Sequence, residues 1–126
     1  MRIKKFRKKT ARRFHKIDGA SAEVIELFVR DTSMDIIRDC ELDVTIKNVI
    51  LTGSRCRGKE HPGSDIDVLV EYEGDMKEYV LFNILNGDEV LFGGVTIDIN
   101  PVRKEETGPL EEYLEQVERY LRKKKK

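Results

Sequence analysis

Long apolar runs are missing from this sequence. No run of eighteen apolar residues occurs in its 126 residues, so we expect no membrane-spanning segment. The basic N-terminus lacks the apolar stretch and small-residue cleavage site of a signal peptide. Cysteine is also scarce, because only Cys40 and Cys56 are present, too few for a disulfide framework. These features predict a reduced, cytoplasmic location and no membrane partner.

The net charge of zero conceals a strong segregation of charge along the chain. Residues 1–17 contain nine Lys or Arg and no acid, and residues 122–126 add five more basic residues. Only ten basic residues remain to face all 24 acids between positions 18 and 121. The basic ends could bind nucleic acid or an acidic protein, act as solvated tethers, or lie against the acidic body of the chain. Few aromatic residues accompany them, so nucleic acid is possible but not the favoured partner.

The length fits one domain, and the sequence contains no internal repeat. We predict a basic N-terminal extension at 1–17 with little periodicity and partial mobility, a folded domain at 18–122, and a Lys tail at 123–126. The first helix is expected to be amphipathic, with a stripe at helical spacing that is widened by three isoleucines. The stripe consists of Val24, Leu27, Phe28, Asp31 and Met34, and the isoleucines are Ile25, Ile36 and Ile37. The predicted elements are a helix at 20–38 (breakable near Asp31), strands at 44–51 and 65–72, a helix at 76–86, a short edge strand at 89–92, a strand at 95–100 halted by Pro101, and a helix at 110–121.

This order of elements predicts the fold class. Strands and helices follow one another with a loop at 52–64 between the first two strands. A small mixed β-sheet packed against helices on one face accommodates that order, which gives a two-layer α+β domain.

Residues 53–70 are the most informative segment and read G-S-R-C-R-G-K-E-H-P-G-S-D-I-D-V-L-V. A Gly-Ser pair ends one predicted strand, and Asp65-Ile66-Asp67 begins the next. Aspartates at i and i+2 of a strand point to the same face. Side by side without partners they would repel, and a bound cation resolves that repulsion. The segment therefore suits a magnesium–triphosphate site.

A third acid, Asp98, lies within the predicted strand at 95–100. Thr96, Asp98 and Asn100 share one strand face, while the alternate residues are apolar. An acid in the middle of a strand is costly without a partner, which favours a ligand role for Asp98.

The segment resembles the defining motif of the minimal nucleotidyltransferases, the smallest branch of the DNA polymerase beta-like superfamily. Their pattern is G-S-x-A-R-G, a short spacer, and S-D-[IL]-D-[LVI]-[LV]-V. Cys56 stands where the family usually has Ala, and both are small. The resemblance covers roughly residues 45–103. The positions that match are Gly53, Ser54, Arg57, Gly58, Ser64, Asp65, Ile66, Asp67, Leu69 and Val70.

The resemblance implies a nucleotidyltransferase fold for 18–122 and a magnesium-dependent transfer of a nucleoside monophosphate, AMP from ATP in the first instance, to a hydroxyl. Asp65 and Asp67 would bridge two Mg²⁺ ions, and Asp98 would complete one of them. The expected nucleotide-binding residues are Gly53, Ser54, Arg55, Arg57 and Ser64. For each arginine the alternative is a solvated loop charge.

The acceptor is left open by the sequence. Small members of the family often act with a separate helical partner protein, and some adenylylate a tyrosine of that partner as antitoxins. The alternatives are an inactive nucleotide- or partner-binding module on the same fold, or an enzyme that extends a nucleic-acid end. More faintly, the whole chain resembles domains at the ends of large polypeptides encoded on mobile elements of gut bacteria, which implies a bacterial source.

Overall fold

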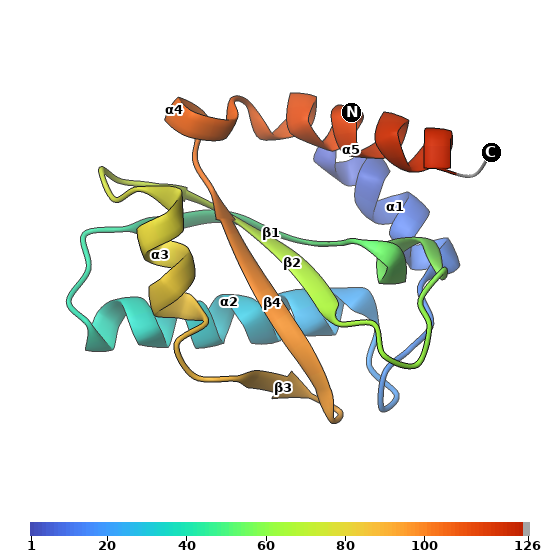
Figure 1. The fold of residues 1–126 in the computed structure, drawn as a ribbon, viewed down its shortest axis with the longest axis horizontal. Coiled ribbons are helices and arrows are strands. Elements are labelled where there is room, and N and C mark those ends of the chain that lie inside the picture. The colour runs from blue at the N-terminus through green and yellow to red at the C-terminus, as the bar shows by residue number, and fades with distance from the viewer. Residues whose placement is uncertain (125–126) are drawn as a thin grey trace.

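The computed structural model describes residues 1–124 and has a mixed sheet with helices on its sides (Figure 1). Its elements are α1 (Ile3–Arg13), α2 (Ala22–Asp39), β1 (Thr45–Thr52), the 3₁₀ helix η1 (Ser54–Arg57), β2 (Ile66–Glu73), α3 (Glu78–Leu85), β3 (Val90–Phe92), β4 (Val95–Val102), α4 (Lys104–Thr107) and α5 (Leu110–Lys124).

The four strands form one sheet in the order β1-β2-β4-β3. β1 and β2 are antiparallel, β2 and β4 are parallel, and β3 and β4 are antiparallel. β2 is one of the two inner strands, and its residues Ile66, Val68 and Val70 are fully buried on one face. The predicted mixed sheet is therefore confirmed.

The helices complete an α+β domain, as predicted. α2 contacts β1 and β2, α3 contacts β4, and these two helices contact each other. α1 contacts η1 and α5, and Figure 1 shows α1 and α5 together beside the β1 edge of the sheet. Within residues 1–124 no helix is long and apolar enough to cross a membrane.

The N-terminal segment differs from the expected aperiodic extension, because residues Ile3–Arg13 form α1. Phe6 and Thr10, one helical turn apart, are 1% and 2% exposed. The Met1 ammonium group lies 3.0 Å from Glu115 on α5. This basic segment thus lies against the acidic body, one of the three alternatives above. The predicted Lys tail lies partly outside the described residues, which end at 124 within α5.

α2 is one continuous helix of 18 residues and is not broken near Asp31. The predicted apolar stripe was wrong for three of its members, since Val24, Leu27 and Met34 are 47%, 55% and 51% exposed. α2 carries apolar residues on two sides, so helical spacing alone does not identify the side that packs on the sheet. The buried side consists of Ala22, Ile25, Glu26, Val29, Ser33 and Ile37.

β4 also continues past its predicted end. Pro101 lies inside the strand and pairs with Val70 of β2. β3 pairs only with Val95–Ile97, so β4 is an edge strand at Pro101. A missing N–H is tolerated at such a position because no neighbouring strand needs it.

Candidate active site

The sheet brings two of the predicted aspartates together. Asp67 of β2 pairs directly with Asp98 of β4 in the parallel register, and Asp67 also pairs with Thr52 of β1. Both aspartates are partly buried and alternate with the buried residues of their strands, so both project from the same face of the sheet. Asp65 directly precedes β2, two residues before Asp67, and is exposed.

Burial and the neighbouring acids raise the pKa of Asp67 and of Asp98. Burial raises the pKa of Asp67, and the charges of Asp98 and Asp65 raise it further. Burial also raises the pKa of Asp98, and the charge of Asp65 and a hydrogen bond with its side chain raise it further. Among the side chains described, residues 1–120, no Lys, Arg or His forms an ion pair with any of the three. The site is therefore a group of acids without an internal counter-charge.

The donor set suits a hard divalent cation, although it does not form a closed shell. In the described part of the chain, no three His, Cys, Asp or Glu side chains converge into a ready metal-binding group. Carboxylate oxygens are the ligands that Mg²⁺ prefers, usually one or two of them together with substrate phosphates and water. Asp98 lies near the charge of Asp65, which raises the pKa of Asp98, and a cation bound between them would relieve this repulsion. The residues present therefore fit a magnesium ion.

Gly53 joins β1 to η1 directly beside Asp67. Its backbone has φ +73° and ψ −163°, in a region that side chains disfavour. A Cβ at this position would lie 2.3 Å from Asp67 Oδ2. Only glycine therefore lets the turn approach the carboxylate. Ser54 follows at the start of η1 and is partly exposed, as a phosphate contact requires.

Arg55 and Ser64 hold the loop between η1 and β2. Arg55 is 8% exposed, and its Nε and Nη2 donate hydrogen bonds of 3.3 and 2.9 Å to the Ser64 carbonyl. The Ser64 hydroxyl accepts a hydrogen bond of 3.0 Å from the His61 amide. Through these hydrogen bonds Arg55 and Ser64 hold the loop closed. Their expected contacts with phosphate stay predictions.

Arg57 and Cys56 lie on the inner side of η1. Arg57 is 8% exposed rather than solvated, and its Nη1 is buried without a hydrogen-bond partner in the described residues. Cys56 is fully buried, and that burial raises its pKa to about 11. The interpretation of Cys56 as a small packing residue therefore agrees with its surroundings.

Helices distant in sequence support this turn from behind, and sequence reasoning missed them. Arg13 of α1 lies 3.5 Å from Glu118 of α5, an acid that is 2% exposed. A Cβ on Gly58 would lie 2.4 Å from the Arg13 carbonyl oxygen, so α1 and η1 are in close contact. His15 contacts Glu60 of the loop at 2.6 Å. No local pattern links these residues, which meet only in the folded chain.

Asn86 is a second residue that sequence reasoning missed. Its side chain accepts a hydrogen bond of 3.0 Å from the Ile99 amide and donates one of 2.8 Å to the Ile99 carbonyl. The carboxamide thus continues the β4 ladder beyond the end of β3 and fixes the strand beside Asp98. In the sequence Asn86 indicated only the end of a helix.

The fold and these carboxylates together define a protein of the nucleotidyl-transfer class. A family model described as "Nucleotidyltransferase domain" matches residues 34–124, most of the chain, and the chain belongs to this family. This membership agrees with the resemblance to the minimal nucleotidyltransferases and supports a nucleotidyl-transfer activity in general. Searches of curated proteins and of solved structures find no significant match. α1 and most of α2 precede the matched segment.

Proposed function

We propose that this protein transfers a nucleoside monophosphate, AMP from ATP, to a hydroxyl group, with magnesium held by Asp65, Asp67 and Asp98. The observation that carries the proposal is the direct pairing of Asp67 with Asp98 on one sheet face, beside a glycine turn and without an internal cation. Structural acids elsewhere in the chain have such cations.

The chemistry requires a site that stabilises concentrated negative charge. A bond forms between the acceptor oxygen and the α-phosphorus, the bond from that phosphorus to the bridging oxygen breaks, and pyrophosphate leaves. Magnesium supplies charge neutralisation and polarises the phosphate when it is bound. Asp98, whose pKa is raised by burial and by Asp65, is the group we assign to accept the hydroxyl proton.

The glycine turn is assigned to the triphosphate. Gly53 presents backbone rather than a side chain to the site, and Ser54 offers a hydroxyl and an amide next to it. Arg57, with its buried and unpartnered Nη1, is the better placed of the two arginines for a further anion contact, since Arg55 is committed to Ser64.

The acceptor is proposed to come from another molecule. The described residues 1–124 form the sheet and its covering helices and no second substrate-binding domain. A helical protein partner with an exposed tyrosine fits this requirement, as in the antitoxin-like members of the family.

The test is incubation of the purified protein with ATP and Mg²⁺, alone and with cell lysate, followed by pyrophosphate assay and intact-mass analysis. We expect magnesium-dependent pyrophosphate release and a gain of one AMP on the acceptor. Asp67→Asn should abolish both. Glu71→Gln is the matched control, because Glu71 lies on the same strand and face and its contact to Asn48 at 2.7 Å survives as an amide pair.

Either of two results would contradict the proposal. If turnover survives Asp67→Asn, the assignment of the active site to these aspartates is wrong. ATP binding without pyrophosphate release, whatever acceptor is offered, would leave a nucleotide-binding module on the same fold.

A nucleic-acid acceptor is the second candidate, and one observation favours it. Lys5, Lys8 and Arg12 are exposed along one face of α1 at helical spacing. If they guide an oligonucleotide to the site, its affinity should fall steeply with salt, and replacement of the three by Gln should reduce that salt dependence. A salt-insensitive affinity would exclude this acceptor class.

A further inference from the structure

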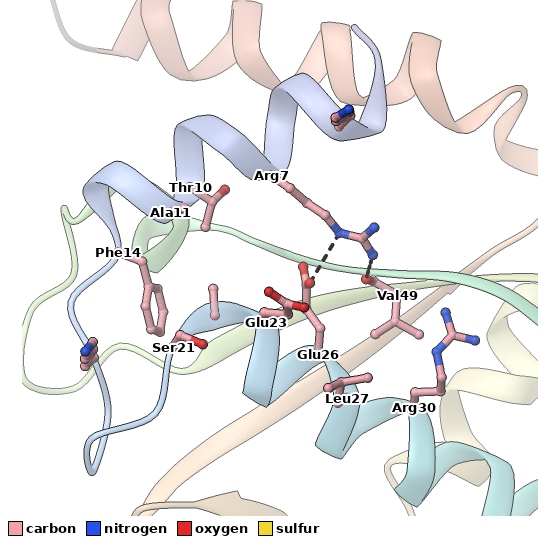
Figure 2. A pocket seen from close by; sticks show the side chains of 13 residues that line it. Arg7, Thr10, Ala11, Phe14, Ser21, Glu23, Glu26, Leu27, Arg30 and Val49 are labelled. Atoms are coloured by element: carbon pink, nitrogen blue, oxygen red, sulfur yellow. Dashed lines mark hydrogen bonds and ion pairs between the residues drawn. The ribbon is translucent and has the colours of Figure 1, made fainter.

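A cavity of about 750 Å³ lies between α1 and the first half of α2, against the edge strand β1 (Figure 2). Its volume lies in the range of about 300–1,000 Å³ that is typical of small-molecule sites. Thirteen residues line it, none of them Asp65, Asp67 or Asp98. The cavity is thus separate from the proposed active site.

The exposed edge of β1 is already occupied by side chains along this cavity. Arg7 Nη2 donates a hydrogen bond of 2.6 Å to the Val49 carbonyl, and Arg30 Nη2 donates one of 3.2 Å to the Lys47 carbonyl. The Leu51 amide donates to Glu26 at 2.8 Å. An added peptide strand would have to displace these bonds, so the cavity favours a small molecule over a strand.

The cavity carries an excess of positive charge. Four of its lining residues are Lys or Arg and two are Glu. Glu26 is committed to Arg7, with a separation of 3.3 Å between Oε1 and Nε. Lys4, Lys16 and Arg30 have no carboxylate within ion-pair distance among the described residues. An anion would therefore find several uncompensated cations here.

The spacing of the two arginines suits one compact anion. Their carbonyl partners, Lys47 and Val49, are two residues apart on β1, which corresponds to about 7 Å along a strand. Each guanidinium keeps N–H groups beyond the one that it donates to β1, and these groups can donate to the oxygens of a single phosphate bound between the two arginines. Figure 2 shows Arg7 and Arg30 reaching the same stretch of β1 from two different helices.

An apolar wall completes the cavity. Phe14 and Ala11 of the α1 end face it from one side, and Leu27 of α2, 55% exposed, faces it from the other. Exposed apolar side chains beside clustered cations are the arrangement that binds a ligand with an anionic head and an apolar body.

We propose that this cavity binds a small organic phosphate, with the phosphate between Arg7 and Arg30 and the apolar body against Phe14 and Leu27. The phosphate of a nucleotide and that of another phosphorylated metabolite share this chemistry. The proposal is independent of the transfer reaction, since it uses none of the residues assigned to that reaction.

The test is titration of the ¹⁵N-labelled full chain with phenyl phosphate, in EDTA so that no magnesium occupies the active site. We expect saturable amide shifts at the cavity residues, and no saturable shifts at Gly53–Arg57. Inorganic phosphate should bind more weakly because it lacks the apolar body, and phenylacetate more weakly because it carries a single charge. A parallel titration with AMP distinguishes a nucleotide source from other organic phosphates.

Arg30→Gln is the decisive variant, because Arg30 contacts only a β1 carbonyl and its loss leaves no buried acid unpaired. Its phenyl phosphate affinity should fall about tenfold, the value of one charge-assisted hydrogen bond. Arg12→Gln, on α1 but outside the cavity, should leave the affinity within about twofold. A circular dichroism melt verifies that both variants remain folded.

Three outcomes would overturn the proposal. They are the absence of saturable shifts at the cavity, saturable shifts at Gly53–Arg57 instead, and equal losses of affinity in Arg30→Gln and Arg12→Gln. The last would indicate general attraction to the basic α1 rather than a formed site.

Discussion

Two regions of this molecule differ in the partners of their acidic side chains. Two arginines of α1 pair with acids of other helices. Arg7 lies 3.3 Å from Glu26 of α2, and Arg13 lies 3.5 Å from Glu118 of α5. On the sheet face Asp67 and Asp98 are also withdrawn from water, yet their neighbours are each other and Asp65. One region pairs its acids with cations of the same chain, and the other provides no cation for its acids among the described side chains.

Under the proposed function, this difference separates structural acids from metal-binding ones. A buried carboxylate with its own cation contributes to holding helices together, and loss of one partner costs stability. Carboxylates that repel one another weaken the fold, and a bound external cation relieves that repulsion. Substitutions in the two regions should therefore change different properties, which the following predictions test.

The largest effect is expected from Asp98→Asn. Loss of this carboxylate should reduce nucleotidyl transfer by about a thousandfold, since the site works by electrostatic stabilisation. Without magnesium the melting temperature should not fall, because the repulsion with Asp65 and Asp67 is relieved. Added Mg²⁺ should raise the melting temperature of the wild type and not of the variant. Thermal melts and pyrophosphate release measure these effects.

The same experiment can contradict the distinction between the acids beside α1 and the acids on the sheet face. If Asp98→Asn lowers the melting temperature in EDTA by as much as a typical core substitution, Asp98 is a structural acid, and the distinction between the two regions fails.

Next in size is Glu118→Gln on α5. Glu118 is 2% exposed, and its replacement leaves the Arg13 guanidinium without a charged partner. Because the Arg13 side chain is 30% exposed, we expect a loss of about 2 kcal/mol, below the usual range for a buried pair. Urea unfolding measures the loss. Glu112→Gln, an exposed position on the same helix, is the control, and an equal change in both variants would refute the structural role.

A smaller, pH-dependent effect is expected at Glu26. Burial raises its pKa, while the hydrogen bond from Leu51 and the charge of Arg7 lower it in part, and the charge of Glu23 adds a small increase. The folded state therefore binds this proton more tightly than the unfolded state does. The contribution of Glu26 to stability is present below the ordinary carboxyl pKa and is lost as pH rises through its raised folded value.

The measurement is the difference in free energy of unfolding between wild type and Glu26→Gln across the acidic range. We expect this difference to shift in favour of Glu26→Gln as pH rises. A difference that is constant with pH would mean that Glu26 titrates alike in both states.

The smallest effect concerns the two thiols. Cys40 is exposed, whereas Cys56 is buried between the two regions, with its pKa raised to about 11 by burial. A disulfide reagent at mildly alkaline pH should therefore modify Cys40 rapidly and Cys56 only when the protein unfolds. Mass mapping identifies the reactive residue. Rapid modification of Cys56 in the native protein would show that α1 does not hold η1 closed.

Much of the site could be predicted because its signals are local. The i, i+2 spacing of Asp65 and Asp67 and the alternation around Asp98 follow from strand geometry, and the strands lie within a residue or two of their predicted bounds. The contact between Arg13 and Glu118 has no such signal, since it depends on how α1 and α5 meet.

The errors have a common physical origin in tertiary packing. α2 presents apolar residues on both sides, and the sheet determines which side is buried. For Arg55 the alternative of a solvated loop charge is wrong, because the side chain is buried and the Ser64 carbonyl is its partner. Pro101 indicated a strand end, but the short β3 leaves that edge free. In each case the partner lies in another part of the chain.

The parallel pairing of β2 with β4 also has a consequence for the order in which the site is assembled. β1 and β2 are neighbours along the chain and can pair as soon as both exist. β4 must first be synthesised and then return past α3 to lie beside β2. A nascent chain therefore carries Asp65 and Asp67 before it has Asp98, and the proposed metal site can assemble only when β4 is in place.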